Sequence, residues 1–268
     1  MKIISYNVNG IRSALSKGLV DFVQSANADV ICLQETKAME SQVESYLFDV
    51  AGYHHRYWLS AEKKGYSGVA LFCKNKPDHV AFGFNDPAYD IEGRIIRADF
   101  GSTSVISVYI PSGSSGETRQ AFKMVWLEYF FNYINNLKAS RPNLIICGDY
   151  NICHQPIDIH DPKSNKDSSG FLPDERAWLT RFIESGFTDS FRMHNTGPHN
   201  YSWWSYRANA RNNNKGWRID YCMVSNTMRS QIKAAGILPH AKHSDHCPVW
   251  VELLTDEVTL HTNLPGIV

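Results

Sequence analysis

Five short polar clusters stand in this sequence at the points where apolar, strand-like runs end. They occupy residues 5–9, 33–37, 147–151, 217–221 and 243–246. Asparagine, aspartate, glutamate and histidine recur among them, and these residue types can hold a hard metal ion and activate a water molecule. Such groups are costly to bury without a partner, so structural needs alone seldom end strand after strand in this way. The pattern predicts one metal-dependent hydrolytic site assembled from distant parts of the chain.

The runs before these clusters have the length and composition of β-strands, and helical stretches lie between them. The expected strands cover 2–7, 29–34, 53–60, 67–74, 95–100, 104–110, 143–148, 219–224 and 247–253. The expected helices cover 13–25, 41–48, 117–138, 173–184 and 227–234. This alternation indicates an α/β or α+β architecture. It does not decide between a doubly wound parallel sheet and another arrangement.

The chain has 268 residues, and no linker-like stretch divides it, so one domain is expected over residues 1–254. Its formal charge is zero, which argues against a nucleic-acid partner because DNA affinity rests on Lys and Arg side chains near phosphates. A zero total can still hide a local basic surface. Segment 207–218 holds no acid and lies just before a candidate catalytic aspartate. We expect its four basic side chains to contact the substrate: Arg207, Arg211, Lys215 and Arg218.

The six cysteines form no Cys-x-x-Cys pair, and most sit in apolar runs, where cysteines are usually small buried hydrophobes. This usage fits a reducing compartment. The first residues run straight into an expected strand, which leaves no room for a signal peptide. No apolar run approaches the roughly 18 residues needed to span a membrane. A cytoplasmic protein without membrane attachment is expected.

Seven motifs, in order along almost the whole chain, resemble the exonuclease III family of class II AP endonucleases, a branch of the endonuclease/exonuclease/phosphatase superfamily. They are Asn-Val-Asn-Gly-Ile-Arg at 7–12, Leu-Gln-Glu-Thr-Lys at 33–37, Gly-Tyr-Ser-Gly-Val-Ala at 65–70, Tyr-Ile-Pro-Ser-Gly at 109–113, Gly-Asp-Tyr-Asn at 148–151, Gly-Trp-Arg-Ile-Asp-Tyr at 216–221 and Ser-Asp-His at 244–246. The second and sixth motifs narrow the resemblance to the DNA-repair branch. It implies a four-layered α/β sandwich of two similar halves, with two mixed β-sheets packed face to face and helices outside. It stops near Leu254, so residues 255–268 are expected to form a C-terminal tail, in keeping with the disorder common at chain ends.

Glu35 is the leading candidate for a metal ligand. A carboxylate that ends an apolar strand is costly to bury unless it is paired or coordinated. Mg²⁺ accepts one or two protein carboxylates, with waters and phosphate completing its shell. A structural salt bridge to Lys37 is the alternative interpretation. Asn9, which stands where some members of the resembling family carry Asp, is a further ligand candidate, and Asp245 could ligate a second metal or orient His246.

Asp149 is the candidate general base. Alternation along an extended segment points Asp149 and Asn151 toward the same face. Asn7 could hold Asp149 in position, while Asn151 could donate its amide N–H to the phosphate or to the attacking water. Tyr109 could donate its phenol to a non-bridging oxygen or to the leaving group. The family-like Pro-Ser-Gly motif after Tyr109 favours this role over a buried structural hydrogen bond.

Asp220 and His246 form a second candidate pair. A carboxylate bonded to one imidazole nitrogen fixes the tautomer and raises the basicity of the other nitrogen. The resemblance implies that His246 contacts the scissile phosphate as a cation steered by Asp220. An alternative makes His246 the base and Asp149 the leaving-group acid, and the sequence leaves both open.

An unusually aromatic run precedes the basic segment. The resemblance implies a small apolar pocket formed by Trp203, Trp217 and Ile219. Such a pocket accepts an extruded abasic sugar and rejects a nucleotide that carries a base. The neighbouring Trp204 and Tyr206 are expected in the core, as most clustered aromatic residues are.

Together these candidates imply a Mg²⁺-dependent phosphodiesterase, with Mn²⁺ as an alternative ion. The family resemblance implies that it acts on duplex DNA, cleaving 5′ of abasic sites and processing blocked 3′ ends, and a monomer is expected. The competing interpretations are a general superfamily phosphodiesterase with another substrate and a non-catalytic nucleic-acid-binding domain. A complete set of polar groups argues against the non-catalytic interpretation: Asn7, Glu35, Asp149, Asn151, Asp220 and His246.

Overall fold

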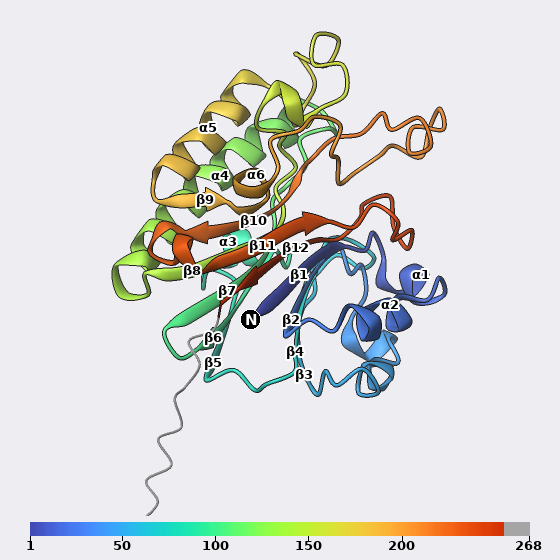
Figure 1. Cartoon of the computed structure of the whole chain (residues 1–268), viewed down its shortest axis with the longest axis vertical. Helices are drawn as coiled ribbons and strands as arrows, with labels where there is room; N and C mark the ends of the chain where they lie inside the picture. The colour runs from blue at the N-terminus through green and yellow to red at the C-terminus, as the bar shows by residue number, and fades with distance from the viewer. Residues whose placement is uncertain (255–268) are drawn as a thin grey trace, which may run out of the picture.

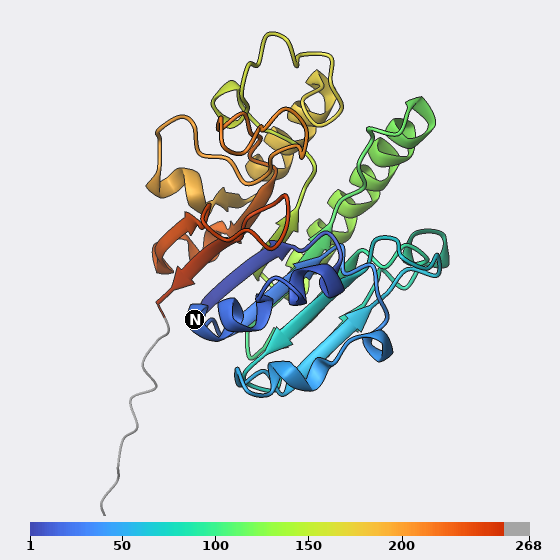
Figure 2. The ribbon, with the colours of Figure 1, turned by 90° about the vertical axis from the view of Figure 1, so that its right-hand side faces the viewer.

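The computed structural model describes residues 1–254, which fold into two six-stranded β-sheets packed face to face with helices on both outer faces (Figure 1, Figure 2). This four-layered α/β sandwich confirms the predicted architecture. The predicted tail at 255–268 lies outside the described residues, and the domain boundary after residue 254 stays a prediction.

The first sheet consists, in spatial order, of β11 (Ile232–Ile237), β12 (Val249–Leu253), β1 (Lys2–Asn7), β2 (Val30–Gln34), β4 (Val69–Cys73) and β3 (His55–Leu59). The second consists of β5 (His79–Phe82), β6 (Ile95–Phe100), β7 (Thr103–Tyr109), β8 (Asn143–Asp149), β10 (Asp220–Ser225) and β9 (Phe187–Asp189). Each sheet has one parallel pair at its centre, β1 with β2 and β7 with β8, flanked by antiparallel strands. The two sheets therefore have the same arrangement of parallel and antiparallel strands.

Helices cover the outer face of each sheet. The helices are α1 (Ile11–Leu15), α2 (Leu19–Ala26), α3 (Pro87–Asp90), α4 (Glu117–Ser140), α5 (Pro173–Glu184) and α6 (Ser190–His194). The 3₁₀ segments are η1 (Glu40–Gln42), η2 (Ser45–Phe48), η3 (Pro156–Asp158) and η4 (Asn226–Gln231). Apolar side chains of α1 and α2 pack on the first sheet, and those of α4 and α5 pack on the second. Within residues 1–254, no helix is long and apolar enough to cross a membrane.

The two sheets meet in a core of inward-facing apolar side chains. Branched residues such as Val105 and Ile145 of the second sheet and Leu71 and Val251 of the first are fully buried there. All six cysteines are buried and unpaired, as the sequence predicted. Burial of this many apolar groups between the layers is the main contribution to stability.

Three expected helices differ from the structure. The stretch 13–25 forms two helices, because Gly18 adopts a φ of +87° between them. The stretch 41–48 forms the 3₁₀ segments η1 and η2. A helix at 227–234 is wrong, since η4 ends at Gln231 and the chain continues as the edge strand β11, which pairs with β12. Pairing with a neighbouring strand overrides local helical spacing here.

The central strands bring the predicted polar residues to one edge of the sandwich. Asn7 ends β1, and Glu35 follows β2 directly. Tyr109 ends β7 and lies in register with Asp149, which ends β8. Asp220 begins β10 directly opposite Asp149, because these two strands are antiparallel. The C-terminal ends of β1, β2, β7 and β8 and the start of β10 thus build the site.

Candidate active site

A pocket of about 450 Å³ opens at this edge of the sandwich. Nine predicted site residues line it: Asn9, Glu35, Tyr109, Asn151, Trp203, Trp217, Ile219, Asp245 and His246. Asn7, Asp149 and Asp220 are buried next to them. The structure therefore gathers all the predicted residues into one site except the four basic side chains.

Glu35 is held on both of its carboxylate oxygens. Oε1 accepts a hydrogen bond from Asn7 Nδ2 at 2.9 Å, and Oε2 lies 2.8 Å from Lys37 Nζ. Burial disfavours the charged form, but the Lys37 ammonium and the Asn7 hydrogen bond outweigh it and lower the pKa of Glu35. Glu35 is therefore a carboxylate at neutral pH. The salt bridge considered as the alternative forms at the pocket itself, where both residues line the opening.

Asp149 lies 1% exposed at the centre of the site. Its Oδ2 accepts from Asn7 Nδ2 at 2.8 Å, and its Oδ1 accepts from the backbone N–H of Asn151 at 2.8 Å. Asn7 therefore joins Glu35 and Asp149, one from each half of the molecule. Burial, reinforced by the nearby Asp220 carboxylate, raises the pKa of Asp149. A carboxylate with a raised pKa is a stronger proton acceptor.

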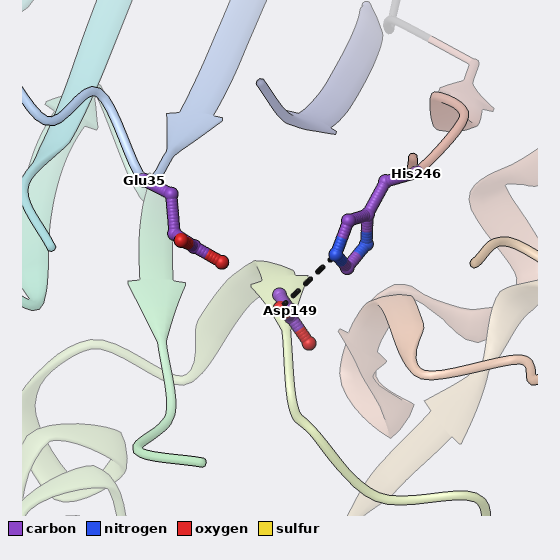
Figure 3. Close-up of side chains that lie close together, drawn as sticks. All are labelled: Glu35, Asp149 and His246. Carbon is purple, nitrogen blue, oxygen red and sulfur yellow. Dashed lines mark ion pairs between the residues drawn. The ribbon is translucent and has the colours of Figure 1, made fainter. Parts of the chain in front are cut away.

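His246 lies between two carboxylates. Its Nδ1 is 2.9 Å from Asp220 Oδ2, and its Nε2 is 3.8 Å from Asp149 Oδ2 (Figure 3). Ser202 Oγ donates to the same Asp220 oxygen at 2.7 Å. Burial opposes the charged imidazole, but the Asp220 charge and hydrogen bond outweigh burial and raise the pKa of His246. Because Nδ1 donates to Asp220, Nε2 is the nitrogen left for Asp149 or a substrate.

Glu35, Asp149 and His246 offer ligand atoms that lie within 4.8 Å of one another, and Figure 3 shows their side chains converging from three separate segments. Carboxylate oxygens suit a hard divalent ion, which completes its shell with water and phosphate oxygens. Glu35 is the carboxylate of this cluster that lines the open pocket. The donor set therefore fits a divalent metal ion.

Asn9 and Asp245 form a neighbouring group. Asn9 Nδ2 donates to Asp245 Oδ1 at 2.8 Å, while Asn9 Oδ1 accepts from Lys37 Nζ at 2.5 Å. The indole of Trp203 donates to Asp245 Oδ2 at 3.0 Å. Because the Asn9 oxygen already faces an ammonium, metal ligation by Asn9 requires Lys37 to move. Ligation of a second metal by Asp245 stays a prediction.

Tyr109 presents a protonated phenol to the pocket. Its side chain is largely buried beneath Arg94, whose guanidinium carbon lies 4.7 Å from the ring centre. Arg94 Nη1 also donates to the Tyr109 carbonyl oxygen at 2.9 Å. Burial and the nearby Glu35 charge raise the pKa of Tyr109 well above its usual value. Tyr109 therefore keeps its proton and can act as a hydrogen-bond donor.

Trp203 and Trp217 form an apolar wall of the pocket. Their rings meet edge to face, with centroids 5.9 Å apart, and their backbones pair through two hydrogen bonds of 2.9 Å each. Ile219 and Phe171 pack behind them. Gly170 lies against Trp217, because a Cβ atom at this glycine would stand 3.0 Å from the indole. The wall is thus apolar, and the Gly170 backbone packs directly against it.

Arg218 is not a substrate contact, and this prediction is wrong. Its side chain is 1% exposed and lies 2.7 Å from both Asp158 and Asp189. Two buried carboxylates compensate its charge, which fixes Arg218 inside the protein. Its partners lie 60 and 29 residues away, so the local sequence gave no signal of this role.

The other three basic residues lie nearer the surface. Arg207 and Lys215 are exposed, and Arg211 packs over Trp204 while donating to the carbonyl oxygen of Ser244 at 2.8 Å. Their contact with a substrate stays a prediction. Trp204 is buried as expected.

Tyr206 corrects another expectation. It is 71% exposed instead of lying in the core, and it stands in a surface loop beside Asp245.

Two features of the site escaped sequence reasoning. Ser202 Oγ accepts from the backbone amides of Ile219 and Asp220 at 3.1 Å each while donating to Asp220. The hydroxyls of three further serines line the pocket: Ser112, Ser114 and Ser169. Serine is common in loops, so the sequence does not distinguish these four serines from the others. Only their positions in the fold place them at the site. Lys37, by contrast, lay within a recognised motif and could have been proposed as a pocket cation.

Comparison with known proteins identifies one family. The model of the Endonuclease/Exonuclease/phosphatase family matches residues 4–246. The chain is 45% identical over 251 residues to an exodeoxyribonuclease of Bacillus subtilis, covering 93% of this chain and 98% of that protein. It is 40% identical over 251 residues to the DNA repair nuclease APEX1 of Danio rerio, covering 93% and 81%. Among solved structures, an AP endonuclease from Archaeoglobus fulgidus matches with a TM-score of 0.87 at 29% identity, covering 95% of this chain and 100% of that one.

These matches confirm the resemblance found in the seven motifs. The family and sequence matches extend over nearly the whole chain, and the solved structure has the same fold. The matched range contains Glu35, Asp149 and Asp220, which lie at strand ends. The chain belongs to the endonuclease/exonuclease/phosphatase family and is a hydrolytic nuclease of its DNA-repair branch.

Proposed function

We propose that this nuclease hydrolyses the phosphodiester 5′ of abasic sites in duplex DNA and uses the same site to process blocked 3′ ends. One observation carries the proposal: the carboxylates of Glu35 and Asp149, joined by Asn7, meet His246 beside a wall of two tryptophans. The relatives, an exodeoxyribonuclease, a DNA repair nuclease and an AP endonuclease, support DNA as the substrate.

Asp149 is the proposed acceptor of the proton from the attacking water. Hydrogen bonds from Asn7 and Asn151 orient its two oxygens, and its raised pKa suits proton uptake. His246, held through Nδ1 by Asp220, presents its Nε2 to the phosphate as a cation. Tyr109 donates its phenolic proton toward the leaving alkoxide or a non-bridging oxygen. The reverse assignment, with His246 as base and Asp149 as acid, stays the alternative: the raised pKa of His246 disfavours a neutral imidazole, whereas the raised pKa of Asp149 favours its protonated form.

Mg²⁺ is the proposed resident ion, held through Glu35 with Asp149 close by. When bound, it polarises a phosphoryl oxygen and neutralises the charge that develops in hydrolysis. Mn²⁺ is the alternative, because it is satisfied by the same oxygen ligands. The low pKa of Glu35 keeps this ligand ionised and ready for the metal at neutral pH.

Trp203, Trp217 and Ile219 are the proposed selectors for the abasic sugar. A deoxyribose without a base is small and presents apolar faces, which suits the wall they form. A nucleotide with a base must also fit an aromatic ring beside this wall. Steric exclusion of the base thus favours damaged sites.

The test uses three 5′-labelled oligonucleotides with one sequence: a duplex with a tetrahydrofuran abasic analogue, the same duplex undamaged, and the abasic single strand. Each is incubated with Mg²⁺, with Mn²⁺ and with EDTA. We expect a metal-dependent nick 5′ of the analogue in the duplex, and much slower loss of 3′-terminal nucleotides from the undamaged duplex. Equal cutting of damaged and undamaged duplexes, or cutting in EDTA, would contradict the proposal.

We also propose that the chain acts as a cytoplasmic monomer. Six free and buried cysteines are compatible with a reducing compartment. Analytical ultracentrifugation with and without duplex DNA tests the monomer, and cell fractionation tests the location.

A further inference from the structure

A buried ion pair lies behind the pocket, between α4 and α5. Lys123 and Glu175 are both 0% exposed, and Lys123 Nζ lies 2.5 Å from Glu175 Oε1. The burial of two full charges costs free energy of folding unless additional hydrogen bonds satisfy both ions. Two apolar side chains of similar volume often fill such a space without loss of stability. Stability alone therefore does not require charges at these two positions.

The hydrogen bonds of this pair lead to the pocket. Lys123 Nζ donates to the carbonyl oxygen of Asn151 at 2.8 Å. Glu175 Oε2 accepts from the backbone amides of Gly170 and Leu172 at 2.6 and 3.0 Å. Asn151 and Gly170 line the pocket from different segments. The same ion pair thus anchors the turn after β8 and the glycine that packs on Trp217.

Gln120, nearly one helical turn before Lys123, extends this arrangement. Its Nε2 donates to Glu175 Oε1 at 3.0 Å, and its Oε1 accepts from Ser169 Oγ at 2.7 Å. Ser169 also lines the pocket. Gln120, Lys123 and Glu175 form the α4–α5 cluster, which holds three pocket-lining residues without facing the pocket itself.

The turn at Asn151 needs such support. Asn151 has a φ of +53°, a left-handed conformation that is sparsely populated outside glycine. Its backbone N–H donates to Asp149 Oδ1, and its Nδ2 donates to the carbonyl oxygen of Ile110, both at 2.8 Å. Lys123 holds the backbone carbonyl oxygen of this residue. A shift of the turn therefore moves the hydrogen bond that orients Asp149.

We infer that Lys123 and Glu175 are positioning residues for the reaction, an inference that rests on the proposed function of the site. They act through Asn151 on the orientation of Asp149, and through Gly170 on the wall that receives the sugar. Both side chains are fully buried, so neither touches the substrate. Their effect is on turnover and selectivity, and not on metal binding.

The test compares Lys123→Met, Glu175→Gln and the double variant with the wild-type chain. The double variant removes both charges together, so no uncompensated charge is left in the interior. We expect its Tm to stay within about 4 °C of the wild type. Its kcat on the abasic duplex should fall by about 10- to 100-fold, in the range found when groups that orient active-site ligands are removed. KM and the Mg²⁺ concentration at half-maximal rate should be unchanged.

The matched control is Asp99→Asn, in an ion-pair network that lies outside the pocket. Asp99 is 4% exposed and pairs with Arg97 and Arg141. Loss of this charge should lower Tm and leave kcat of the folded enzyme unchanged. A double variant of Lys123 and Glu175 that behaves like Asp99→Asn overturns the inference, because its role would then be structural only.

A gentler variant keeps the inference testable if the double variant does not fold. Gln120→Leu removes the hydrogen bonds of Gln120 to Glu175 and to Ser169 and leaves the ion pair in place. It should change the ratio of abasic cleavage to 3′-terminal cleavage, and an unchanged ratio contradicts the inference. A wild-type chain inactive on the abasic duplex would overturn the proposed function instead. The variants are then compared on bis(4-nitrophenyl) phosphate, where an undiminished kcat overturns the positioning role.

Discussion

At the scale of single residues, the hydrogen-bond and ion-pair partners of Glu35 stabilise its ionised form. It accepts from Asn7 and pairs with Lys37, and its pKa is lowered. We predict that Glu35→Gln raises the Mg²⁺ concentration at half-maximal rate by about 10- to 100-fold, because an amide oxygen carries no charge for the ion. DNA affinity, measured without turnover in EDTA, should change little. A Mg²⁺ titration identical to that of the wild type would remove Glu35 from the ligand set.

Asp149→Asn tests the proposed proton acceptor. Asparagine keeps the shape and can still accept from the Asn151 backbone, but it cannot take a proton from water. We predict a fall in single-turnover rate of about 10²- to 10⁴-fold. Retained binding to the abasic duplex and an unchanged Tm serve as the controls. A near-normal rate would exclude Asp149 from the mechanism.

Residue types at strand ends, together with the family resemblance, predicted most of the residues that the structure gathers at the pocket. Acids and amides at strand ends are costly to bury without partners, so their positions pointed to shared chemistry. The same reasoning failed for Arg218, because its compensating carboxylates lie far away in sequence. It also failed for Tyr206, whose exposure is set by a loop that has no periodic signal. Ion-pair partners that lie far apart in sequence, and the exposure of side chains in loops, cannot be predicted from local sequence patterns.

At the scale of elements, a strong local signal gave correct boundaries for one helix. The expected helix at 173–184 matches α5, where Pro173 opens the first turn and two acids follow it. The strand β11 was mistaken for a helix, because its existence depends on hydrogen bonds to β12 that no local signal encodes. The strands β5 and β9 at sheet edges were missed for the same reason. Strands that form only because they pair with a neighbouring strand are therefore hard to predict from local sequence.

The ion pairs around Asp158 fix the segment between β8 and α5 and give a prediction about pH. Asp158 Oδ1 lies 2.7 Å from Arg218 Nε and 2.6 Å from Arg192 Nη2. Burial alone would raise the pKa of Asp158, but the two guanidinium groups outweigh it and lower the pKa. The stabilisation is therefore complete above the unfolded-state pKa of about 3.9. It is lost as pH falls through the lower folded-state pKa.

We predict that Asp158→Ala costs about 3–5 kcal/mol at pH 7, because Arg218 is left with a single buried partner. The variant should also lose less stability than the wild type when the pH falls below about 4. Urea unfolding at pH 7, 5, 4 and 3 measures both effects. Curves that remain parallel across this range would show that Asp158 does not contribute to acid sensitivity.

At the scale of the whole molecule, the site lies where two similarly built sheets meet. Asn7 comes from the first sheet and Asp149 from the second, and each ends a strand of a central parallel pair. Gln34 and Ser107 add a hydrogen bond of 3.1 Å across the same seam. The two halves carry no visible sequence repeat, so their common plan could be expected only from the family resemblance. The proposed catalytic groups thus depend on the packing of the halves, while the proposed selectivity groups Trp203 and Trp217 lie in the loops around them.

Substitution of Trp217 can distinguish an effect on substrate selectivity from an effect on global stability. Its side chain is half-buried, lines the pocket and packs on Trp203 and Gly170. We predict that Trp217→Ala reduces abasic cleavage and leaves the metal requirement unchanged, because Trp217 holds no ligand. Removal of the ring also relaxes the exclusion of a base. The ratio of abasic cleavage to undamaged 3′-terminal cleavage should therefore shift toward the undamaged substrate.

Trp126 of α4 provides the matched control, since it is a tryptophan with no exposed surface in the core of the second half. Its truncation to alanine should cost about 3–5 kcal/mol and lower Tm, while the two cleavage rates fall in parallel with the folded fraction. Trp217→Ala should instead change the ratio of the two rates with a smaller loss of Tm, because part of its ring already faces solvent. If Trp217→Ala lowers both rates in parallel and destabilises the protein as Trp126→Ala does, then Trp217 is a core residue and the pocket for the abasic sugar lies elsewhere.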